Sequence, residues 1–447
     1  MAGAVQDLAN FDAALKDKFD GAVRTTLNSE VRLLRRLMEG DVDWSGRRCV
    51  MDINIGRNAS SGARGDNEPL PDAGAQEHRN AYIWSKYNYG RISVSGPTIA
   101  ASRDRMGAFT KVVASETKGA VRDLKVEMNY QMFNDGSGAR ARVNTTVVTG
   151  TILTIDSPHG IAYPVITRLN ATRCLRRNMK IVFGSQRWNP TIRTLNGTST
   201  RKILALDPVN NTITLDAALV TTGGISDNDF IYQEYGYAAT DSTAADNCQL
   251  SREVTGLLGI VDQNTFLENL QGISRNSYAT EWGAAIIGAY ATNSSIGIDG
   301  DIMQMACDDA NERGSGDIDL IFSHHSVRRE YLKDLTRDVR FEPYQLKGGF
   351  KEDTRENRGE GTSLMFNDIP VWFEKDCPYG TMFFIDRSSV KVYKQRDFGF
   401  DDTDGRVLNK IAGYDAFEAF IKVYLNLGSE APNRNAVIRG INHRFTP

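Results

Sequence analysis

Cysteine is scarce in this sequence, and the few cysteines are far apart. The chain has an odd number of them and no Cys-x-x-Cys pair; the five are Cys49, Cys174, Cys248, Cys307 and Cys377. Disulfide-stabilised domains and zinc knuckles both need cysteines at close, regular spacing. The pattern argues against both frameworks and favours a protein made in a reducing cytoplasm.

Long apolar runs and an excess of positive charge are also missing. No apolar stretch approaches the ~20 residues that span a bilayer, and the opening MAGAVQDLANFDAAL lacks the basic start and apolar core of a signal peptide. The net charge is −3, from 53 Lys and Arg against 56 Asp and Glu. A dedicated nucleic-acid binder would carry an excess of Lys and Arg over the whole chain. Any contact with nucleic acid is therefore expected to involve a local group of basic residues.

The common catalytic motifs are absent as well. The sequence has no Gly-Lys dipeptide, which excludes a Walker-type phosphate loop, and neither Gly-x-Gly-x-x-Gly nor Gly-x-Ser-x-Gly occurs. His324 and His325 stand where the strand-like IDLIFS ends and a helix begins, a common position for catalytic groups. A base or ligand role is one interpretation, but a capped helix start is favoured, because no His-x-x-x-His or nearby cysteine completes a site. We expect no catalytic residue, cofactor or metal.

The first hundred residues contain two unusual segments. Residues 4 to 39 carry apolar residues at helical spacing, which predicts a helical N-terminal arm. Residues 54 to 84 are rich in Gly, Ser, Asn, Asp and Pro between strand-like flanks, which predicts a long two-stranded loop without a core at its tip. A disordered surface loop is possible, but docking on a neighbouring chain is favoured, because compact domains seldom keep long loops without a purpose.

A long helix is predicted from Ser102 to Asn134. Its apolar positions recur every three or four residues and form one stripe of a 3.6-residue helix, and a glycine-rich stretch follows it. At 1.5 Å per residue the helix would be about 50 Å long, so we expect it to cross a subunit as a spine. The stripe consists of Met106, Phe109, Val113, Thr117, Ala120, Leu124, Met128 and Met132.

The remaining chain has two parts of different character. Residues 141 to 246 contain strand-like segments between turns, including the hairpin signal KILALDPVNNTITLD, and predict a small inserted β-rich domain. Helices and strands alternate in the residues that follow. The predicted fold class is α+β, with an arm over 1–50, the loop and its flanking strands over 51–100, the spine over 101–140, the insertion over 141–246 and a mixed region over 247–447.

This order of parts resembles the major capsid protein of tailed bacteriophages, the Hong Kong type or Johnson fold. The similarity rests on GDNEPLPDAG at the loop tip, YNYGRISVSGPTIAAS before the spine, the spine itself, and IDLIFSHHSVRREYL and LMFNDIPVWFEKDCPYGTMFFID further on. It covers most of the chain except the β-rich insertion. The resemblance implies an N-terminal arm, an extended loop, a spine helix, and peripheral and axial domains.

The resemblance also implies a function. Many copies would form hexamers and pentamers and close into an icosahedral virion shell around double-stranded DNA, assembled in the cytoplasm of a host bacterium. The implied partners are further copies of the chain, a portal protein, DNA held without sequence preference, and a decoration protein as a further candidate. A separate scaffolding protein is expected, since the arm and loop begin within the first 60 residues. The alternatives are an encapsulin-like bacterial nanocompartment and an α/β enzyme that uses His324 or His325.

Particular residues receive roles from this resemblance. The candidates for facing DNA are Arg24, Arg32, Arg35 and Arg36. Some family members join subunits covalently through an extended-loop lysine, but residues 51 to 85 contain none, and a guanidinium stays protonated and cannot be that nucleophile. We expect a non-covalent shell held by charge-assisted hydrogen bonds to the adjacent subunit. The loop residues assigned to these bonds are Arg64, Asp66, Glu68 and Arg79.

Overall fold

The structure is a computed structural model of the chain. It describes residues 32–38, 40–58, 60–69, 71–97, 106–144, 150–163, 170–188, 190–193, 199–219, 225–234, 252–290, 296–338, 364–402, 405 and 407–441. For residues 106–115 and 335–338 the structure describes the backbone alone, and for the other residues in these ranges it describes the side chains as well. Of the predicted arm, the described part contains helix α2 (Arg32–Met38). No helix in the described ranges is both long and apolar enough to cross a membrane.

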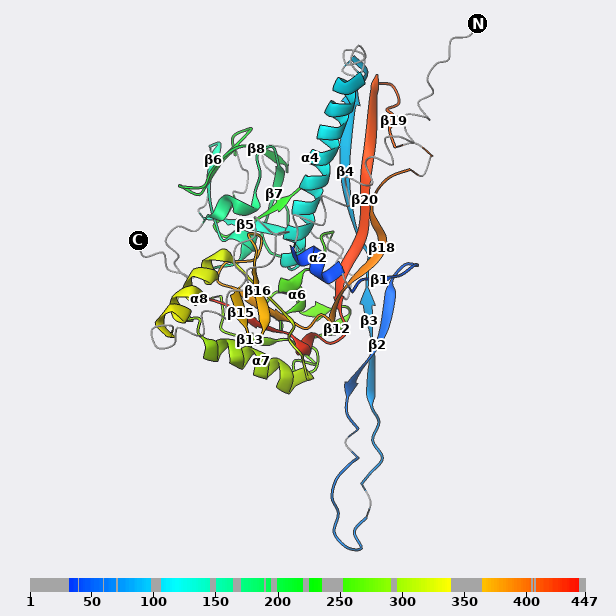
Figure 1. Ribbon diagram of the computed structural model, residues 1–447, viewed down its shortest axis with the longest axis vertical. Helices are drawn as coiled ribbons and strands as arrows, with labels where there is room; N and C mark the ends of the chain where they lie inside the picture. Colours follow the sequence, from blue (N-terminus) through cyan, green and yellow to red (C-terminus); the bar gives the residue numbers. More distant parts are fainter. Residues whose placement is uncertain are drawn as a thin grey trace.

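A hairpin projects far from the rest of the molecule (Figure 1). Strands β2 (Cys49–Gly56) and β3 (Glu77–Ile83) pair antiparallel, with Val50 opposite Tyr82. The described residues between them form no helix or strand, and residues 61–69 are all exposed. The two-stranded loop predicted from the sequence is therefore confirmed as a hairpin, and its tip has no core of its own.

The predicted spine is helix α4 (Met106–Phe133), which runs beside a five-stranded sheet (Figure 1). The central strand β20 (Ala416–Ser429) pairs antiparallel with both β4 (Lys86–Ser95) and β18 (Val390–Phe400). The short strands β1 (Val42–Asp43) and β19 (Asn409–Lys410) complete the sheet.

The spine packs closely on this sheet. Leu124 and Met128 are buried, as the apolar stripe requires. A Cβ added at Gly90 of β4 would lie 3.9 Å from Leu124 Cδ2 and 3.7 Å from Ile421 Cβ, so the helix comes close enough to the strand here that an added methyl group would touch it. After the helix, Gly136 has φ 91° in the region that favours glycine, which lets the chain turn away.

Six strands that follow the spine close into a barrel with its own core. The order around the barrel is β10-β5-β6-β9-β8-β7. The strands are β5 (Ala139–Val143), β6 (Ile152–Asp156), β7 (Lys180–Gly184), β8 (Arg201–Asp207), β9 (Thr212–Leu215) and β10 (Phe230–Gln233), with the short 3-10 helices η1 (Pro158–Gly160) and η2 (Ala171–Cys174) between them. The hairpin predicted from KILALDPVNNTITLD is the β8–β9 pair. Val143, Phe183 and Ile213 are among the side chains that fill the interior.

The rest of the chain builds a mixed six-stranded sheet in the order β13-β21-β17-β14-β16-β15. The strands are β13 (Ala285–Ile287), β14 (Leu320–Ser323), β15 (Leu364–Phe366), β16 (Ile369–Phe373), β17 (Met382–Ile385) and β21 (Ala436–Ile438). Helices α7 (Gly300–Gly314) and α8 (His325–Asp338) pack with it, and Asp299 caps α7 by accepting the Ile302 N–H at 2.9 Å. The smaller elements are α6 (Leu257–Ile260), β11 (Asn269–Leu270), β12 (Ile273–Ser274) and η3 (Pro432–Arg434).

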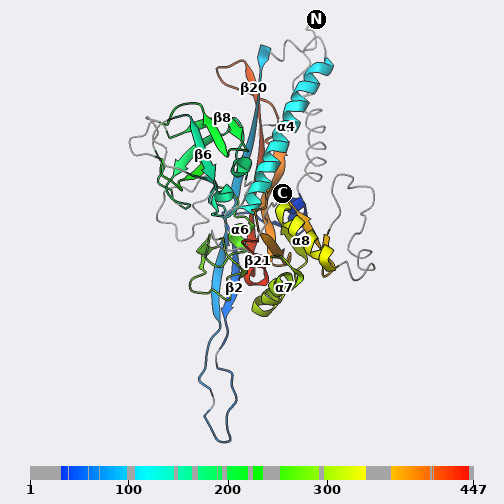
Figure 2. The same ribbon diagram turned by 90° about the vertical axis from the view of Figure 1, so that its left-hand side faces the viewer.

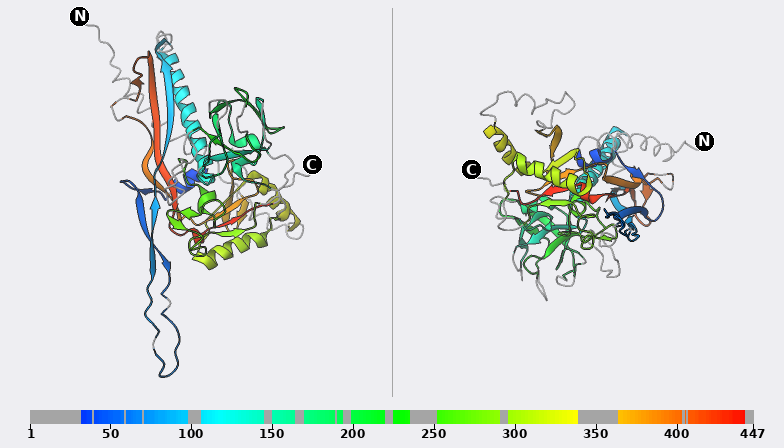
Figure 3. Two further views of the ribbon diagram at one scale, coloured as in Figure 1. Left: turned by 180° about the vertical axis from the view of Figure 1, so that it is seen from behind. Right: turned by 90° about the horizontal axis from the view of Figure 1, so that it is seen from below.

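The barrel and helix α8 lie on opposite sides of the molecule. Figure 2 shows the barrel on one side of the spine and α8, with α2 beside it, on the other. The view from below in Figure 3 agrees: the barrel and the yellow helix α8 lie on either side of the six-stranded sheet. The molecule therefore has two different faces, with the projecting hairpin at one end.

We predict that Leu124→Asp unfolds the spine and its sheet. The substitution places an unpaired carboxylate in the contact between α4 and β4, which costs about 3 kcal/mol or more. Lys118→Asp, at an exposed position of the same helix, is the matched control and should cost less than about 0.5 kcal/mol. Chemical unfolding followed by circular dichroism measures both. Equal stabilities of the two variants would show that the stripe is not packed as described.

Candidate functional site

The tip of the hairpin carries three of the predicted interface residues. Arg64, Asp66 and Glu68 are all exposed. The Glu68 carboxylate accepts the Gly65 N–H at 2.8 Å, and Arg64 donates to the carbonyl of Ala63 at 3.1 Å. Within the described part of the chain, no hydrogen bond or ion pair joins these three side chains to the body of the molecule. Their bonds to an adjacent subunit stay a prediction.

Arg79 lies at the base of the hairpin and already has partners in its own chain. It pairs with Glu77 at 2.6 Å and donates from Nε to the Tyr278 hydroxyl at 3.1 Å. The hydrogen bond from Tyr278, followed by the one from Arg79, holds the pKa of Glu77 below its usual value. This cluster connects the hairpin base to the body, a contact that the sequence did not indicate.

The predicted spine residues divide into two groups. Leu124 and Met128 belong to the large core cluster shared with the sheet and with α2. Met106, Phe109 and Val113 are in helix α4, but their side chains lie outside the described residues.

Three of the four arginines predicted to face DNA are among the described residues. Arg24 is outside them. The guanidinium groups of Arg32 and Arg36 lie over the Trp372 ring, 5.7 and 4.9 Å from its centroid, and Arg35 is exposed. The Arg32 N–H also donates to the Glu374 carboxylate at 3.0 Å. Two of these arginines therefore help to fix α2 to the body, and contact with DNA stays a prediction.

His324 and His325 stand at the start of α8. His324 Nδ1 accepts the Ser326 N–H at 3.1 Å and lies 2.8 Å from the Ser326 hydroxyl, so its side chain caps the helix. The pKa of the exposed His325 lies below its usual value because of desolvation and of nearby arginines, first Arg32 and then Arg328. The arrangement is that of a capped helix start.

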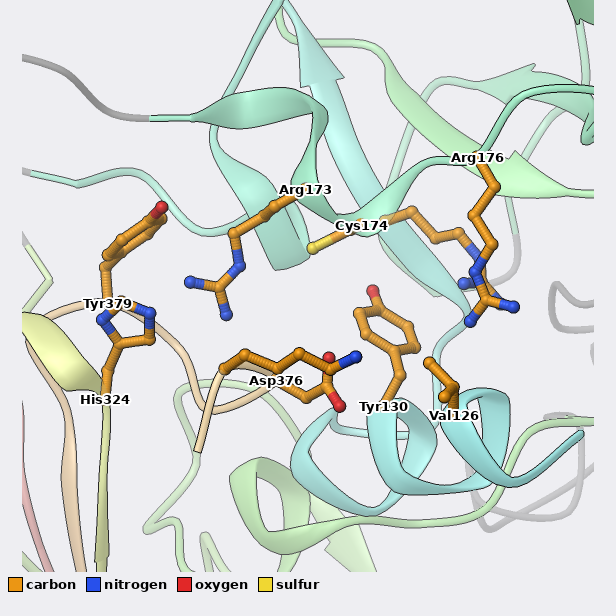
Figure 4. A pocket seen from close by; sticks show the side chains of 10 residues that line it. Val126, Tyr130, Arg173, Cys174, Arg176, His324, Asp376 and Tyr379 are labelled. Carbon is orange, nitrogen blue, oxygen red and sulfur yellow. The ribbon is translucent and has the colours of Figure 1, made fainter. Parts of the chain in front are cut away.

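A polar cavity of about 270 Å³ lies where the barrel, the spine and the six-stranded sheet meet (Figure 4). Side chains from all three units form its wall, and most are charged or polar. The lining residues are Val126, Tyr130, Arg140, Arg173, Cys174, Arg176, His324, Lys375, Asp376 and Tyr379.

One end of the cavity contains a buried charge network. Arg140 pairs with Glu127 and, at 3.1 Å, with Glu253, and Arg176 reaches Glu127 at 3.2 Å. Burial alone would raise the pKa of Glu127, but the two arginines hold it below its usual value. Burial raises the pKa of Glu253 to about 7, against the opposing effect of Arg140. The network therefore contains two carboxylates with different affinities for a proton.

The cavity has no activated nucleophile among its described lining residues. Burial raises the pKa of the Cys174 thiol, which disfavours the reactive thiolate. The Tyr130 hydroxyl donates to the carbonyl of Ala139, and burial keeps the pKa of this tyrosine well above its usual value. In the described ranges, no three His, Cys, Asp or Glu side chains are grouped as metal ligands.

A second buried ion pair connects the barrel to the end of the spine. Arg187 donates from Nε to Asp135, which is fully buried, and from Nη1 to the carbonyl of Gly160 at 3.0 Å. The next residue, Trp188, donates from its indole N–H to the carbonyl of Phe266 at 2.6 Å. The barrel is thus a domain with its own core that is attached to the body by these charged and polar contacts and by Ile161 and Tyr163, which are buried in the main core.

The sequence interpretation missed the cavity. Its wall combines residues that are far apart in the chain, so no local motif could reveal it. The one available signal was the run TRCLRRN, residues 172–178, with three arginines in five positions of an otherwise β-rich region. Two of these arginines, Arg173 and Arg176, line the cavity.

Comparison with known proteins gives a clear result for the fold. The sequence matches no protein-family model and no curated protein. The capsid of cyanophage A-1(L) matches the structure with a TM-score of 0.54 and 11% identity, over 92% of this chain and 93% of that chain. The SrpI encapsulin of Synechococcus elongatus matches with a TM-score of 0.43 and 7% identity, over 92% of this chain and 87% of that chain. A chain of Mycobacterium phage Bobi matches with a TM-score of 0.39 and 9% identity, over 92% of this chain and 91% of that chain. The chain has the fold of the cyanophage capsid protein, as the sequence predicted.

We predict that Arg187→Met destabilises the chain by about 3–5 kcal/mol, because it leaves the buried Asp135 without a counter-ion. Arg122→Met removes a pair with Asp123 in which both side chains are exposed, and it should cost less than about 1 kcal/mol. Adding Asp135→Asn to Arg187→Met should restore part of the loss. Unfolding free energies of the variants test this, and equal costs for the two arginines would contradict it.

We also predict a specific pH dependence from Glu253. Its carboxyl holds a proton up to about pH 7 in the folded chain but releases it near its ordinary value of 4.5 when unfolded. The folded state binds more protons in this window, so the stabilisation present below pH 4.5 is lost as the pH rises through 7. The unfolding free energy of the wild type minus that of Glu253→Gln should fall by about 3 kcal/mol between pH 4.5 and 7.5. A constant difference would contradict the assignment.

Proposed function

We propose that the chain is the major capsid protein of a tailed bacteriophage and that many copies form an icosahedral shell around double-stranded DNA. The hairpin carries this proposal. Its exposed tip has no core, and side chains there make only local contacts, so a single chain gains nothing from holding it extended. A second copy that receives the tip would supply the missing contacts. The fold shared with the cyanophage capsid supports this function.

Within this proposal each unit has a place in the shell. The hairpin is the extended loop, α4 and the five-stranded sheet form the peripheral domain, the six-stranded sheet forms the axial domain, and the barrel is the insertion. Head-to-tail contacts between copies would close into hexamers and pentamers. A scaffolding protein, a portal protein and a decoration protein are the proposed further partners.

The two faces of the molecule suggest how the shell is oriented. Helices α2 and α8 lie opposite the barrel (Figure 2), and α2 carries three of the four arginines predicted to face DNA, Arg32, Arg35 and Arg36. We assign the α2 face to the interior, where Arg35 would contact phosphates without reading bases. The barrel then projects outward. Binding of isolated subunits to one DNA sequence over others would contradict this assignment.

We predict that shortening the hairpin abolishes assembly without unfolding the chain. In the test variant a two-residue Asn-Gly turn replaces residues 58–75, which keeps both paired strands and removes the tip. The thermal midpoint of the unassembled chain should stay within about 1 °C of the wild type, since no core contact is lost. Electron microscopy should show closed shells for the wild type and none for the variant. Normal shells from the shortened chain would contradict the proposal.

The contents of purified particles separate the capsid from its alternatives. Nuclease-protected DNA in particles from infected cells supports a virion shell, whereas protein cargo without DNA supports an encapsulin-like compartment. An enzymatic role for His324 and His325 predicts that His324→Asn/His325→Gln, which retains a helix-capping side chain, keeps assembly but loses a measurable activity.

A further inference from the structure

We propose that the cavity at the junction of barrel, spine and six-stranded sheet binds a small phosphate-type oxyanion, which connects the barrel to the body of the molecule. This inference concerns the single chain and does not depend on the proposed shell.

Arg173 supplies the first reason. Its Nη2 donates to the carbonyl of Cys377 at 2.6 Å, and its guanidinium lies 4.3 Å from the centroid of the Tyr379 ring. These contacts orient the charge without neutralising it. The Nη1 atom is buried and has no acceptor in hydrogen-bond geometry among the described residues. Burial opposes the charge of Arg173, and the Cys174 and Tyr379 side chains favour it, Tyr379 also through a hydrogen bond to the guanidinium. Burying a charged donor without an acceptor is unfavourable, so a bound acceptor atom near the Nη1 N–H would stabilise the folded chain.

His159, which also contacts the Arg173 guanidinium, supplies no negatively charged acceptor. His159 Nε2 lies 3.3 Å from Arg173 Nη2, and burial together with Arg173 keeps the pKa of this histidine well below its usual value. His159 is therefore neutral. It can hold the guanidinium in place but brings no negative charge.

Lys375 supplies the second, independent reason. It comes from the loop between β16 and β17 and lines the same cavity. Within the described part of the chain, its ammonium makes no hydrogen bond or ion pair. The residue is exposed, so the cavity is open to solvent at this side chain and an ion can enter.

Positive side chains outnumber negative ones in the wall of the cavity, where Arg140, Arg173, Arg176 and Lys375 stand against one carboxylate, Asp376. Arg140 and Arg176 are paired with Glu127. The carboxylate in the wall, Asp376, accepts the neutral Asn129 amide at 2.6 Å. This hydrogen bond cancels no charge, so Asp376 offsets one of the two positive charges of Arg173 and Lys375, and one remains. Figure 4 shows the Arg173 guanidinium in the space between Tyr379 and Asp376, with Arg176 at the far end.

An oxyanion of the phosphate class suits these groups. Its several acceptor oxygens can take the unpaired N–H of Arg173 and the ammonium of Lys375 at once, in the charge-assisted geometry that arginine and lysine offer to phosphates. A cavity of about 270 Å³ leaves room for such an ion with water. Because Arg173 belongs to the barrel side and Lys375 to the sheet side, the bound ion would join the two units.

The test uses the full chain and inorganic phosphate. Thermal unfolding is followed at pH 7 in sodium phosphate and in sodium chloride of equal ionic strength, with isothermal titration calorimetry for the affinity. Phosphate at about ten times its Kd should raise the midpoint by about 1–2 °C over chloride. Lys375→Ala, which removes no hydrogen bond or ion pair within the described part of the chain, should weaken phosphate binding at least tenfold. Arg177→Ala, at an exposed position of the barrel next to Arg176, is the matched control and should bind as the wild type does.

Two further arms identify the source of the phosphate. The dinucleotide pTpT carries a terminal phosphate, whereas TpT has only the phosphodiester. If pTpT alone competes with inorganic phosphate, the site binds a terminal or free phosphate. If both dinucleotides compete, the site also binds the phosphodiester of a DNA backbone. Equal midpoint shifts in the wild type and Lys375→Ala would mean a general salt effect and would overturn the proposal. The absence of any phosphate effect would overturn it as well.

Discussion

The packing of helix α4 on strands β4 and β20 is the contact on which the rest of the structure depends. It brings the long helix close to the sheet at Gly90, where an added Cβ would touch Leu124, and it buries Leu124 and Met128 in the largest core cluster. The end of this helix fixes the start of the barrel, because β5 begins six residues after Phe133. The hairpin also originates from this region, since β3 leads directly into β4. A rigid spine thus places two appendages, the barrel and the hairpin, that differ in how they are stabilised.

The barrel and the hairpin are stabilised in opposite ways. The barrel closes its sheet and fills it with apolar side chains of its own. The Arg187–Asp135 pair, the Arg140 network and the side chains of Ile161 and Tyr163, which are buried in the main core, join it to the body. The hairpin has a paired base, fixed by Arg79, Glu77 and Tyr278, and a tip with no apolar support. Buried ion pairs hold a domain in one orientation at little net gain in stability. An unsupported tip, by contrast, has to be stabilised by another molecule.

The sequence predicted the parts of the fold that depend on local pattern. The spine was visible because Leu124, Met128 and their neighbours recur at helical spacing, and the β8–β9 hairpin because alternating residues flank an Asn-rich turn. The loop was visible because it lacks apolar residues. The cavity was not, because Arg173 and Lys375 are 202 positions apart in the numbering and meet only through the tertiary fold. For the same reason the pairing of Arg79 with Tyr278 and the stacking of Arg36 on Trp372 could not be foreseen. Local periodicity reports elements, whereas sites made of distant charged residues require the three-dimensional arrangement.

The central claim is that the hairpin tip obtains its stabilisation from another copy of the chain. Amide hydrogen exchange of residues 57–76, compared between unassembled subunits and closed particles, tests this most directly, because exchange reports local stability. The account predicts fast exchange at the tip in the subunit and strong protection in the particle, while the buried strands of the barrel are protected in both. Equally fast exchange of the tip in both states would contradict it.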